Sequence, residues 1–396
     1  MAEQSGRPQA RRSILGLAAG GLLAVALAGC QLVPAPRQEP PPPAPEPVQE
    51  APPLPPGPGL PPDETRNRVA VLVPISGPNA GVGQSIANAA NLALLDTGGE
   101  RIRITVYDTA KGGPAAAANE ALADGNGLFL GPLLAEDVRA VAAIARKADV
   151  PVIAFSNDVS VAGGGVYLMG FTPGQSVGRV VDYARSKGVE RFAALTPNGV
   201  YGRRAAQAMV EATRGAGLVG MQNFDRDAAS IRAAAGRLNA QGGYDAVLVA
   251  DSGRTAALAA PALRAGSPAA RILGTELWAT EAALGKMPGL RGAWYASVSD
   301  TMFNQLRTRY RARYGTNPYR LASLGYDAVL LAVRVAKDWR IGRAFPERAL
   351  RDQGGFAGVD GAFRFGPNGI AERSLEVREV TVAGTIVLSP ASRGFD

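Results

Sequence analysis

Short runs of β-branched and aliphatic residues alternate with alanine-rich stretches of helical periodicity along most of the chain after residue 66. In the first half of this region, the pattern predicts strands at 68–73, 103–107, 127–130 and 150–155 and helices at 83–95, 115–123 and 136–147. Strands that alternate with helices of about 10–15 residues favour right-handed βαβ units around a parallel sheet.

The same alternation starts again near residue 177. It predicts helices at 177–187, 203–215, 227–241 and 255–264 and strands at 191–195, 218–224, 246–249 and 271–273. Helices at 303–314 and 321–340 follow, and the end of the chain has the alternation of antiparallel strands. Two such halves predict an α/β fold of two Rossmann-like lobes with parallel sheets and an inter-lobe cleft, where loops at the carboxyl ends of the strands converge.

The N-terminus has a different pattern, which is typical of an export signal. Arginines 7, 11 and 12 precede an uninterrupted run of 15 apolar and glycine residues, Ile14–Ala28. This run is shorter than the roughly 20 residues that span a bilayer, and it ends in small residues, as a secretory signal does. The adjacent arginines leave both the general and the twin-arginine export routes open.

Cys30 is the only cysteine of the chain, and it directly follows this run. Leu27–Cys30 resembles the bacterial lipobox, which implies that residues 1–29 are a removable signal peptide and that Cys30 is the lipid anchor. The alternative is an ordinary signal peptide with an incidental cysteine. Because residue 31 is Gln and not Asp, the resemblance implies the periplasmic face of the outer membrane rather than the inner membrane.

A proline-rich segment follows, with 15 of the chain's 30 prolines between residues 31 and 63. Such a segment lacks the backbone donors for a helix or a sheet, and it favours an extended chain of about 3.1 Å per residue. Residues 30–65 are therefore predicted to be the lipidated Cys30 and a disordered tether. Recognition of the prolines by an aromatic groove is the alternative.

Composition then limits the chemistry. The chain has no histidine, which excludes Ser-His-Asp and Cys-His catalysis and every histidine-ligated metal site. A carboxylate pair or a Ser-Lys arrangement is still allowed, but we expect no enzyme, no cofactor and no metal. The net charge of +8 comes from scattered arginines without interleaved aromatic residues, which indicates a solvated surface rather than a nucleic-acid groove.

Several segments resemble the leucine/isoleucine/valine-binding proteins of the type I periplasmic-binding-protein superfamily. They are Val71–Asn79, Gly83–Ser85, Asn88–Ala90, Asp149–Ala154, Tyr201–Arg203, Gly325–Ala328 and Gly361–Gly369. The resemblance implies one such domain over residues 66–390, with three crossovers and hinge closure. Lobe 1 is expected at about 66–170 plus part of 321–390, and lobe 2 at about 171–320.

The resemblance also implies candidate ligand-binding residues in the cleft: Ser76, Ala135, Ser156, Asn157, Tyr201 and Glu276. Glu276 matches the acid that pairs an α-amino group, and Tyr201 could stack on a ligand. Ala135 stands where these proteins carry a hydroxyl for the ligand carboxylate, so this donor is missing. Ser156 and Asn157 could supply one wall of the pocket.

Two stretches, Tyr107–Thr109 and Gly131–Leu134, instead resemble penicillin-binding-protein activators, which are outer-membrane lipoproteins. The departure is that the helical-repeat domain of the larger activators is absent. The first hypothesis is a non-enzymatic envelope lipoprotein that binds and activates a peptidoglycan synthase. The alternative is a receptor that delivers branched-chain amino acids or related amides to an ABC permease.

Overall fold

The computed structural model describes residues 63–214, 216–281 and 283–395. The expected signal peptide, Cys30 and nearly all of the expected tether lie outside these residues. Within them, no helix combines the length and apolar character that crossing a bilayer requires.

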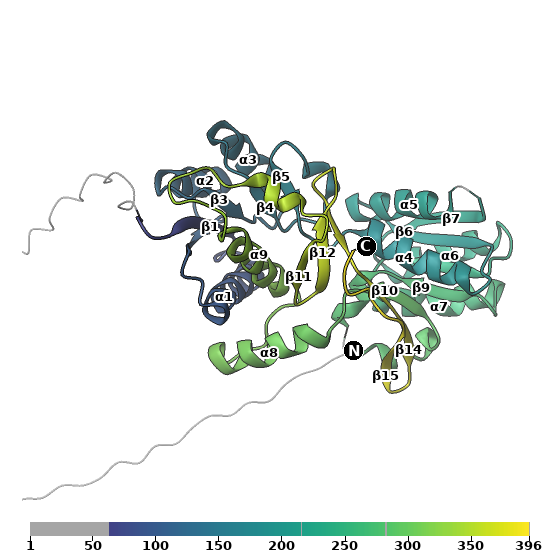
Figure 1. Cartoon of the computed structure of the whole chain (residues 1–396). Helices are drawn as coiled ribbons and strands as arrows, with labels where there is room; N and C mark the ends of the chain where they lie inside the picture. The colour runs from purple at the N-terminus through teal and green to yellow at the C-terminus, as the bar shows by residue number, and fades with distance from the viewer. Residues whose placement is uncertain (1–62, 215, 282, 396) are drawn as a thin grey trace, which may run out of the picture. The chain divides into compact units, whose positions relative to one another are not determined.

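A five-stranded parallel sheet forms the centre of lobe 1, in the order β2-β1-β3-β4-β5 (Figure 1). Its strands are β1 (Asn67–Val73), β2 (Ile102–Asp108), β3 (Leu128–Leu130), β4 (Val152–Ala154) and β5 (Val166–Leu168). The helices between them are α1 (Ala80–Thr97), α2 (Pro114–Ala123) and α3 (Ala135–Ala145), with short 3₁₀ turns η1 (Arg146–Ala148) and η2 (Val159–Val161).

All seven residues of β1 are buried because helices cover both faces of this sheet. Side chains of successive strand residues point to opposite faces, so β1 contributes to two cores. Val69, Val71 and Val73 pack with α1, whereas Ala70 and Leu72 pack with α2 and α3. Because both faces of β1 are buried, Val69–Val73 form a continuous apolar run in the sequence.

Lobe 2 is built on a seven-stranded sheet in the order β15-β14-β10-β9-β8-β6-β7. The parallel part comprises β6 (Phe192–Pro197), β7 (Leu218–Phe224), β8 (Ala246–Val249), β9 (Arg271–Gly274) and β10 (Trp294–Ser297). The antiparallel hairpin of β14 (Glu376–Thr381) and β15 (Gly384–Ser389) completes it. Its helices are α4 (Pro173–Ser186), α5 (Val200–Thr213), α6 (Ala228–Asn239) and α7 (Gly253–Gly266), with 3₁₀ turns η3 (Glu276–Thr280), η4 (Leu284–Lys286) and η5 (Pro288–Leu290).

The chain passes between the lobes three times: from β5 to α4, from β10 to α8 (Thr301–Tyr314), and from β13 (Ala371–Arg373) to β14. After the second crossover, α8 and α9 (Ala322–Val335) pack into the core of lobe 1, where Phe303, Leu306 and Tyr310 of α8 are buried. The chain therefore returns to lobe 1 near residue 300, before the boundary expected at about residue 320. The 3₁₀ turn η6 (Glu347–Arg351) and a small sheet of β11 (Phe356–Gly358), β12 (Gly361–Phe365) and β13 lie between α9 and the third crossover.

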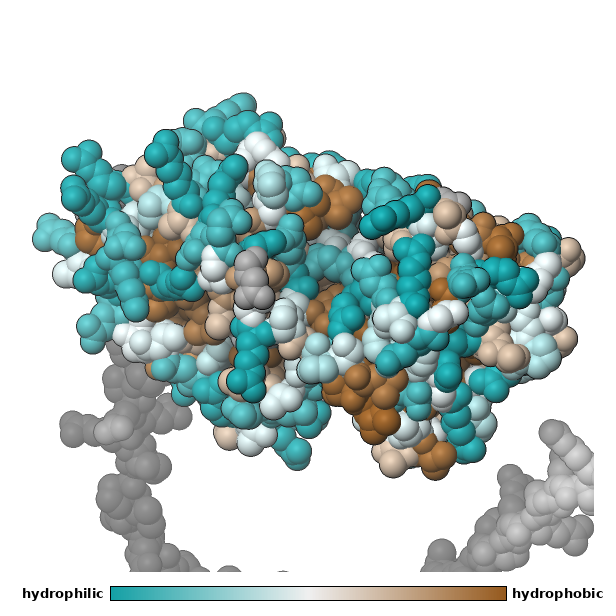
Figure 2. Space-filling view, turned by 45° about the vertical axis from the view of Figure 1, so that its right-hand side comes forward, coloured by the Kyte–Doolittle hydropathy of each residue, from teal (hydrophilic) through white to brown (hydrophobic). Residues whose placement is uncertain are grey.

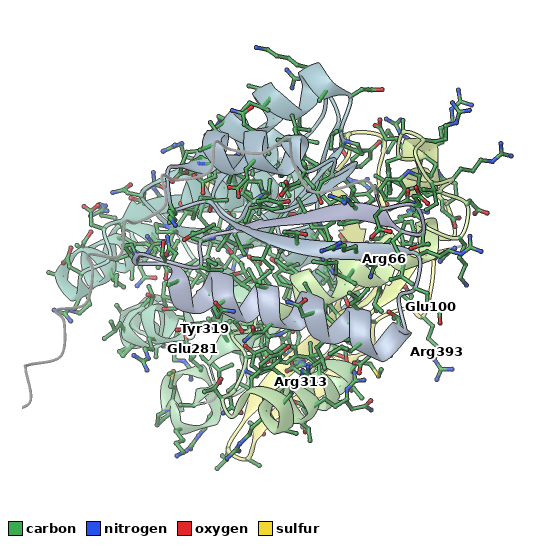
Figure 3. The ribbon with its side chains drawn as sticks, turned by 90° about the vertical axis from the view of Figure 1, so that its left-hand side faces the viewer. Arg66, Glu100, Glu281, Arg313, Tyr319 and Arg393 are labelled. Carbon is green, nitrogen blue, oxygen red and sulfur yellow. The ribbon has the colours of Figure 1, made fainter. Side chains whose placement is uncertain are left out.

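The surface is mainly hydrophilic, with charged side chains on many elements. Figure 3 labels arginines on three separate segments: Arg66 before β1, Arg313 on α8 and Arg393 near the C-terminus. Hydrophobic side chains gather at the lower edge of the face in Figure 2, at the height where Figure 1 places the β14–β15 hairpin. The scattered positive charge agrees with the expected solvated surface.

Candidate functional site

A cavity of about 420 Å³ opens between the two lobes. Loops after β1, β3 and β4 form one side of it, and the segments after β9 and β10 form the other. The lining residues are Asn79, Val82, Leu133, Leu134, Phe155, Asn157, Phe171, Glu276, Leu277, Ala279, Thr280, Ser297, Val298, Arg320 and Leu321. This position at the carboxyl ends of parallel strands is where open α/β sheets bind ligands.

The cavity is predominantly apolar. Two leucines after β3, together with Phe155 after β4 and Phe171 in the first crossover, form the lobe 1 wall, and Leu277 faces them from lobe 2. Apolar walls with a few polar groups are typical of small-ligand pockets. The cavity can therefore enclose an apolar group of a ligand or of a partner side chain.

Glu276 is the acidic side chain of this cavity, and both of its carboxylate oxygens are already engaged. It begins η3, and one residue, Thr275, separates it from the end of β9. The hydroxyl of Tyr201, in the first turn of α5, lies 2.9 Å from Oε1, and the hydroxyl of Ser176 on α4 donates to Oε2. Burial raises the pKa of the Glu276 carboxyl even though both hydroxyls stabilise its charge.

Tyr201 has a positioning role in this arrangement. Its hydroxyl also lies 2.9 Å from Oγ1 of Thr275, and it is not among the side chains that line the cavity. Burial, and then the charge of Glu276, raise the pKa of Tyr201 well above its usual value. The phenol is therefore a neutral donor that holds the carboxylate against the α4–α5 side of lobe 2.

Ser76, Ala135 and Ser156 do not line the cavity. Ser76 lies in an exposed turn, and its hydroxyl forms a hydrogen bond with the carboxylate of Asp108. Desolvation raises the pKa of Asp108, but this bond and the backbone donors around the carboxylate lower the pKa overall. Ala135 is the first residue of α3, one position beyond the lining leucines. Ser156 is buried, and its Oγ accepts from the backbone N–H of Asp158 at 3.2 Å.

Of the six candidates, Asn157 and Glu276 reach the cavity and Tyr201 contacts Glu276. Arg320 and Phe171 are lining residues that the sequence analysis missed. Phe171 belongs to the first crossover, and Arg320 directly precedes Leu321, the residue before α9. Neither the first crossover nor the segment between α8 and α9 carries a recognisable motif, so the sequence offers no signal for either residue.

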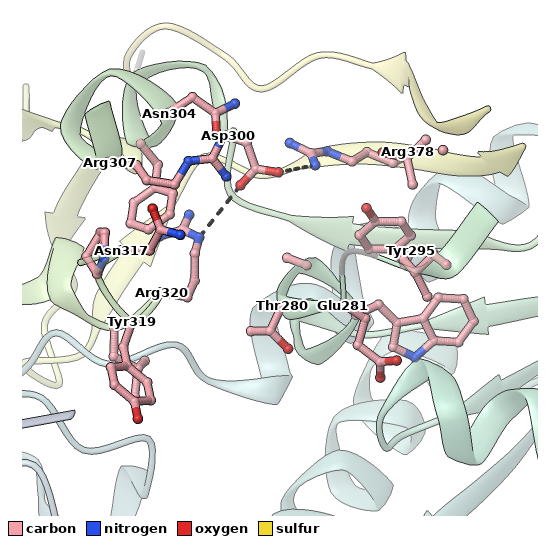
Figure 4. A pocket seen from close by; sticks show the side chains of 18 of the residues that line it. Thr280, Glu281, Tyr295, Asp300, Asn304, Arg307, Asn317, Tyr319, Arg320 and Arg378 are labelled. Carbon is pink, nitrogen blue, oxygen red and sulfur yellow. Dashed lines mark hydrogen bonds and ion pairs between the residues drawn. The ribbon is translucent and has the colours of Figure 1, made fainter. Parts of the chain in front are cut away.

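A second cavity of about 640 Å³ adjoins the first and shares Arg320, Leu321, Ala279 and Thr280 with it. Figure 4 shows its charged residues on both sides of Asp300, which belongs to the second crossover. Asp300 lies 2.5 Å from a guanidinium nitrogen of Arg378 on β14 and 3.6 Å from Nε of Arg320. These charges are paired with one another, so they stabilise the crossovers rather than present an open ligand site.

Comparison with known proteins agrees with this architecture. A family model described as periplasmic binding protein matches residues 67–385. An uncharacterized protein of Rickettsia prowazekii, RP748, is 28% identical over 142 residues, which make up 36% of this chain and 38% of that protein.

Two solved structures illustrate the range of similar folds. The leucine binding protein LivK of Thermotoga maritima has a TM-score of 0.62 at 20% identity, over 82% of this chain and 99% of LivK. Full-length LpoA of Haemophilus influenzae has a TM-score of 0.63 at 18% identity, over 83% of this chain and 60% of LpoA. The α/β fold of two parallel-rich lobes is thereby confirmed, and the chain belongs to the periplasmic binding protein family.

Proposed function

We propose that this protein is a non-enzymatic envelope lipoprotein that binds and activates a peptidoglycan synthase. The observation that carries the proposal is that the candidate ligand-binding groups of the cleft are either already hydrogen-bonded or missing. Glu276 is held by Ser176 and Tyr201, Ser156 is bonded to the backbone, and Ala135 has no hydroxyl. An α-amino acid would find neither a free carboxylate for its amino group nor the expected hydroxyl for its carboxylate, and unpaired charged groups of a ligand are costly to bury.

The likeness to LpoA supports this proposal, because LpoA is a penicillin-binding-protein activator lipoprotein. The match covers 60% of LpoA, so the comparison does not show which partner this chain binds. The synthase is therefore part of the proposal. The proposed anchor at Cys30 and the proline-rich tether fit the same role. They would hold the domain at a distance from the periplasmic face of the outer membrane, within reach of a synthase.

The β14–β15 hairpin supplies a surface for a protein partner. It forms the edge of the seven-stranded sheet. Val382 at its tip is 68% exposed, and Ile386 and Val387 on β15 are each 50% exposed. Grouped apolar side chains on an edge strand are typical of protein interaction sites.

Co-purification tests the proposal. The tagged full-length protein is isolated from its own membranes, and bound penicillin-binding proteins are detected with a fluorescent penicillin. We expect a labelled band that is reduced at least tenfold in the double variant Val382→Asp, Ile386→Asp. The matched control is Val219→Asp, an exposed valine on β7 at the opposite edge of the sheet, which should leave the band unchanged.

The second candidate is a solute receptor that works with an ABC permease. The apolar cavity of about 420 Å³ favours it, because this volume suits a small ligand, and the likeness to LivK agrees. Calorimetric titration with leucine, isoleucine, valine and their amides tests it. Micromolar binding that is lost in Glu276→Ala would favour the receptor and contradict the first proposal.

A further inference from the structure

The hinge region contains a buried cluster of charged side chains that neither proposed function uses. We call it the hinge cluster. It consists of Asp300, Arg320, Asp327, Asp360, Arg373, Glu376 and Arg378. These residues come from the second crossover, the segment before α9, α9 itself, the β11–β12 turn, β13 and β14.

Two buried carboxyl groups interact electrostatically at its centre. Asp327 and Asp360 are both fully buried. Oδ1 of Asp327 accepts from the N–H of Val359 at 2.7 Å, and Oδ2 accepts from the N–H of Asp360 at 3.4 Å. A Cβ at Gly358 would lie 2.3 Å from Oδ2 of Asp327, so glycine is required there for the close approach. Two adjacent buried carboxylates cannot both be charged without a large cost.

One bound proton relieves the charge of the central carboxyl pair. Asp300 is partly exposed, whereas Asp327 and Asp360 are fully buried, so a second negative charge is most costly on this pair. Asp327 is the acid to hold the proton, because burial and then the charge of Asp360 raise its pKa to about 7. In a chain without histidine, this carboxyl supplies a titration near neutral pH.

Two guanidinium groups have unused hydrogen-bonding capacity beside this pair. Arg373 donates from Nη2 to the carbonyl of Met169 in the first crossover at 2.7 Å, but its Nε and Nη1 are buried without a hydrogen-bond partner among the described residues. Arg320 lies 2.7 Å from Asp360 through Nη1 and 3.6 Å from Asp300 through Nε, and its Nη2 is likewise buried without a hydrogen bond. Buried donors without partners are costly, so a rearrangement that pairs them is favoured.

Phe171 connects the hinge cluster to the cleft. Both guanidinium groups lie near its ring, with Arg373 at 4.9 Å and Arg320 at 5.7 Å from the ring centroid. The same ring lines the inter-lobe cavity. A shift of either guanidinium therefore moves a wall of the cleft.

We propose that the Asp327–Asp360 pair is a proton-controlled latch of the hinge. With one proton bound, Arg373 keeps its bond to Met169 and the lobes hold the arrangement described above. When the proton leaves to solvent, the second negative charge draws Nε and Nη1 of Arg373 onto the pair. This weakens the bond to the first crossover, moves Phe171 and changes the angle between the lobes. The latch requires no partner, so it stands or fails independently of the proposed function.

Single-molecule fluorescence transfer between the lobes tests the latch. The full-length chain carries Cys30→Ala and dye-labelled cysteines at the exposed positions Ala116 on α2 and Arg232 on α6. We expect the inter-lobe distance to change between pH 5.5 and 8.5, with a midpoint near 7, and we expect Asp327→Asn to abolish the change. Asp352→Asn, an exposed acid that pairs with Arg334 at 2.6 Å, is the control and should keep the original curve.

A second variant keeps the test decisive if Asp327→Asn does not fold. Asp360→Asn removes the neighbouring charge, so the midpoint should move to lower pH. A distance that is independent of pH in the parent chain, a curve that survives in Asp327→Asn, or an unshifted midpoint in Asp360→Asn would each overturn the latch.

Discussion

At the scale of single residues, the acidic side chain of the cleft already has hydrogen-bond partners. Glu276 would be the natural partner of a ligand amine, yet two hydroxyls of its own lobe bind it. Burial without these donors would cost more, because a carboxylate in an apolar wall needs hydrogen bonds to stay charged. The same donors therefore stabilise lobe 2 and occupy acceptor positions that a ligand amine would use.

Tyr201→Phe tests this role. The substitution removes one donor from Glu276, so the pKa of the carboxyl should rise further, and the free energy of unfolding should fall by about 1–2 kcal/mol. Urea unfolding measures the loss. Tyr319→Phe, which alters a tyrosine that is 54% exposed, should change the free energy by less than half as much. Equal effects of the two variants would contradict the positioning role.

Asp327 makes stability depend on pH in a defined direction. Its pKa is about 7 in the folded chain, above its ordinary value of 3.8, so the folded state binds more protons than the unfolded state between these values. Its contribution is fully present below about pH 4 and is lost as the pH rises through 7. Asp327→Asn should therefore lose less stability than the parent chain between pH 5 and 8 in urea unfolding. Parallel curves for the two proteins would contradict the assignment.

At the scale of elements, the hydrophobic pattern predicted most helices and strands but missed some of the short strands. Strands β5, β10, β11 and β13 were missed; they have only three or four residues each. β5 follows three glycines, which read as a turn, and β10 begins with Trp294 after a series of 3₁₀ turns. Such segments become strands because the sheet beside them offers hydrogen bonds, and a sequence window does not contain that information.

The site was predicted in part for a related reason. Asn157 and Glu276 follow recognisable strands, so their place at the carboxyl edge could be inferred. Phe171 reaches the cavity from the first crossover and Arg320 from the segment between α8 and α9, and the paths of both segments depend on tertiary packing. The engagement of Glu276 by Ser176 and Tyr201, 100 and 75 residues away in the chain, is likewise a tertiary effect.

Helix α6 offers a test of a local signal that the sequence does carry. Asp227 is its N-cap, and its carboxylate accepts from the N–H groups of Ala229 and Ser230 at 3.0 and 2.9 Å. Asp227→Ala should lower the free energy of unfolding by about 1 kcal/mol. Glu120→Ala, an exposed site on α2, should change it by less than about 0.5 kcal/mol. If both variants unfold alike, the cap contributes nothing.

At the scale of the whole molecule, the three crossovers connect the cleft, the hinge cluster and the second cavity. Asp300 and Arg378 tie the second crossover to β14, and Arg373 ties β13 to the first. The domain therefore has three crossovers between its lobes, and the acidic side chain of its cleft is already bound by two hydroxyls. A domain of this kind can serve a protein partner by changing the partner's conformational equilibrium.

The rate of glycan-strand synthesis from lipid II tests the central proposal most directly. The penicillin-binding protein that co-purifies with this chain is assayed alone, with the full-length protein, and with its Val382→Asp, Ile386→Asp variant. We predict that the full-length protein raises the rate severalfold, that the variant does not, and that added leucine has no effect. An unchanged rate in the presence of the full-length protein would contradict the proposed activator.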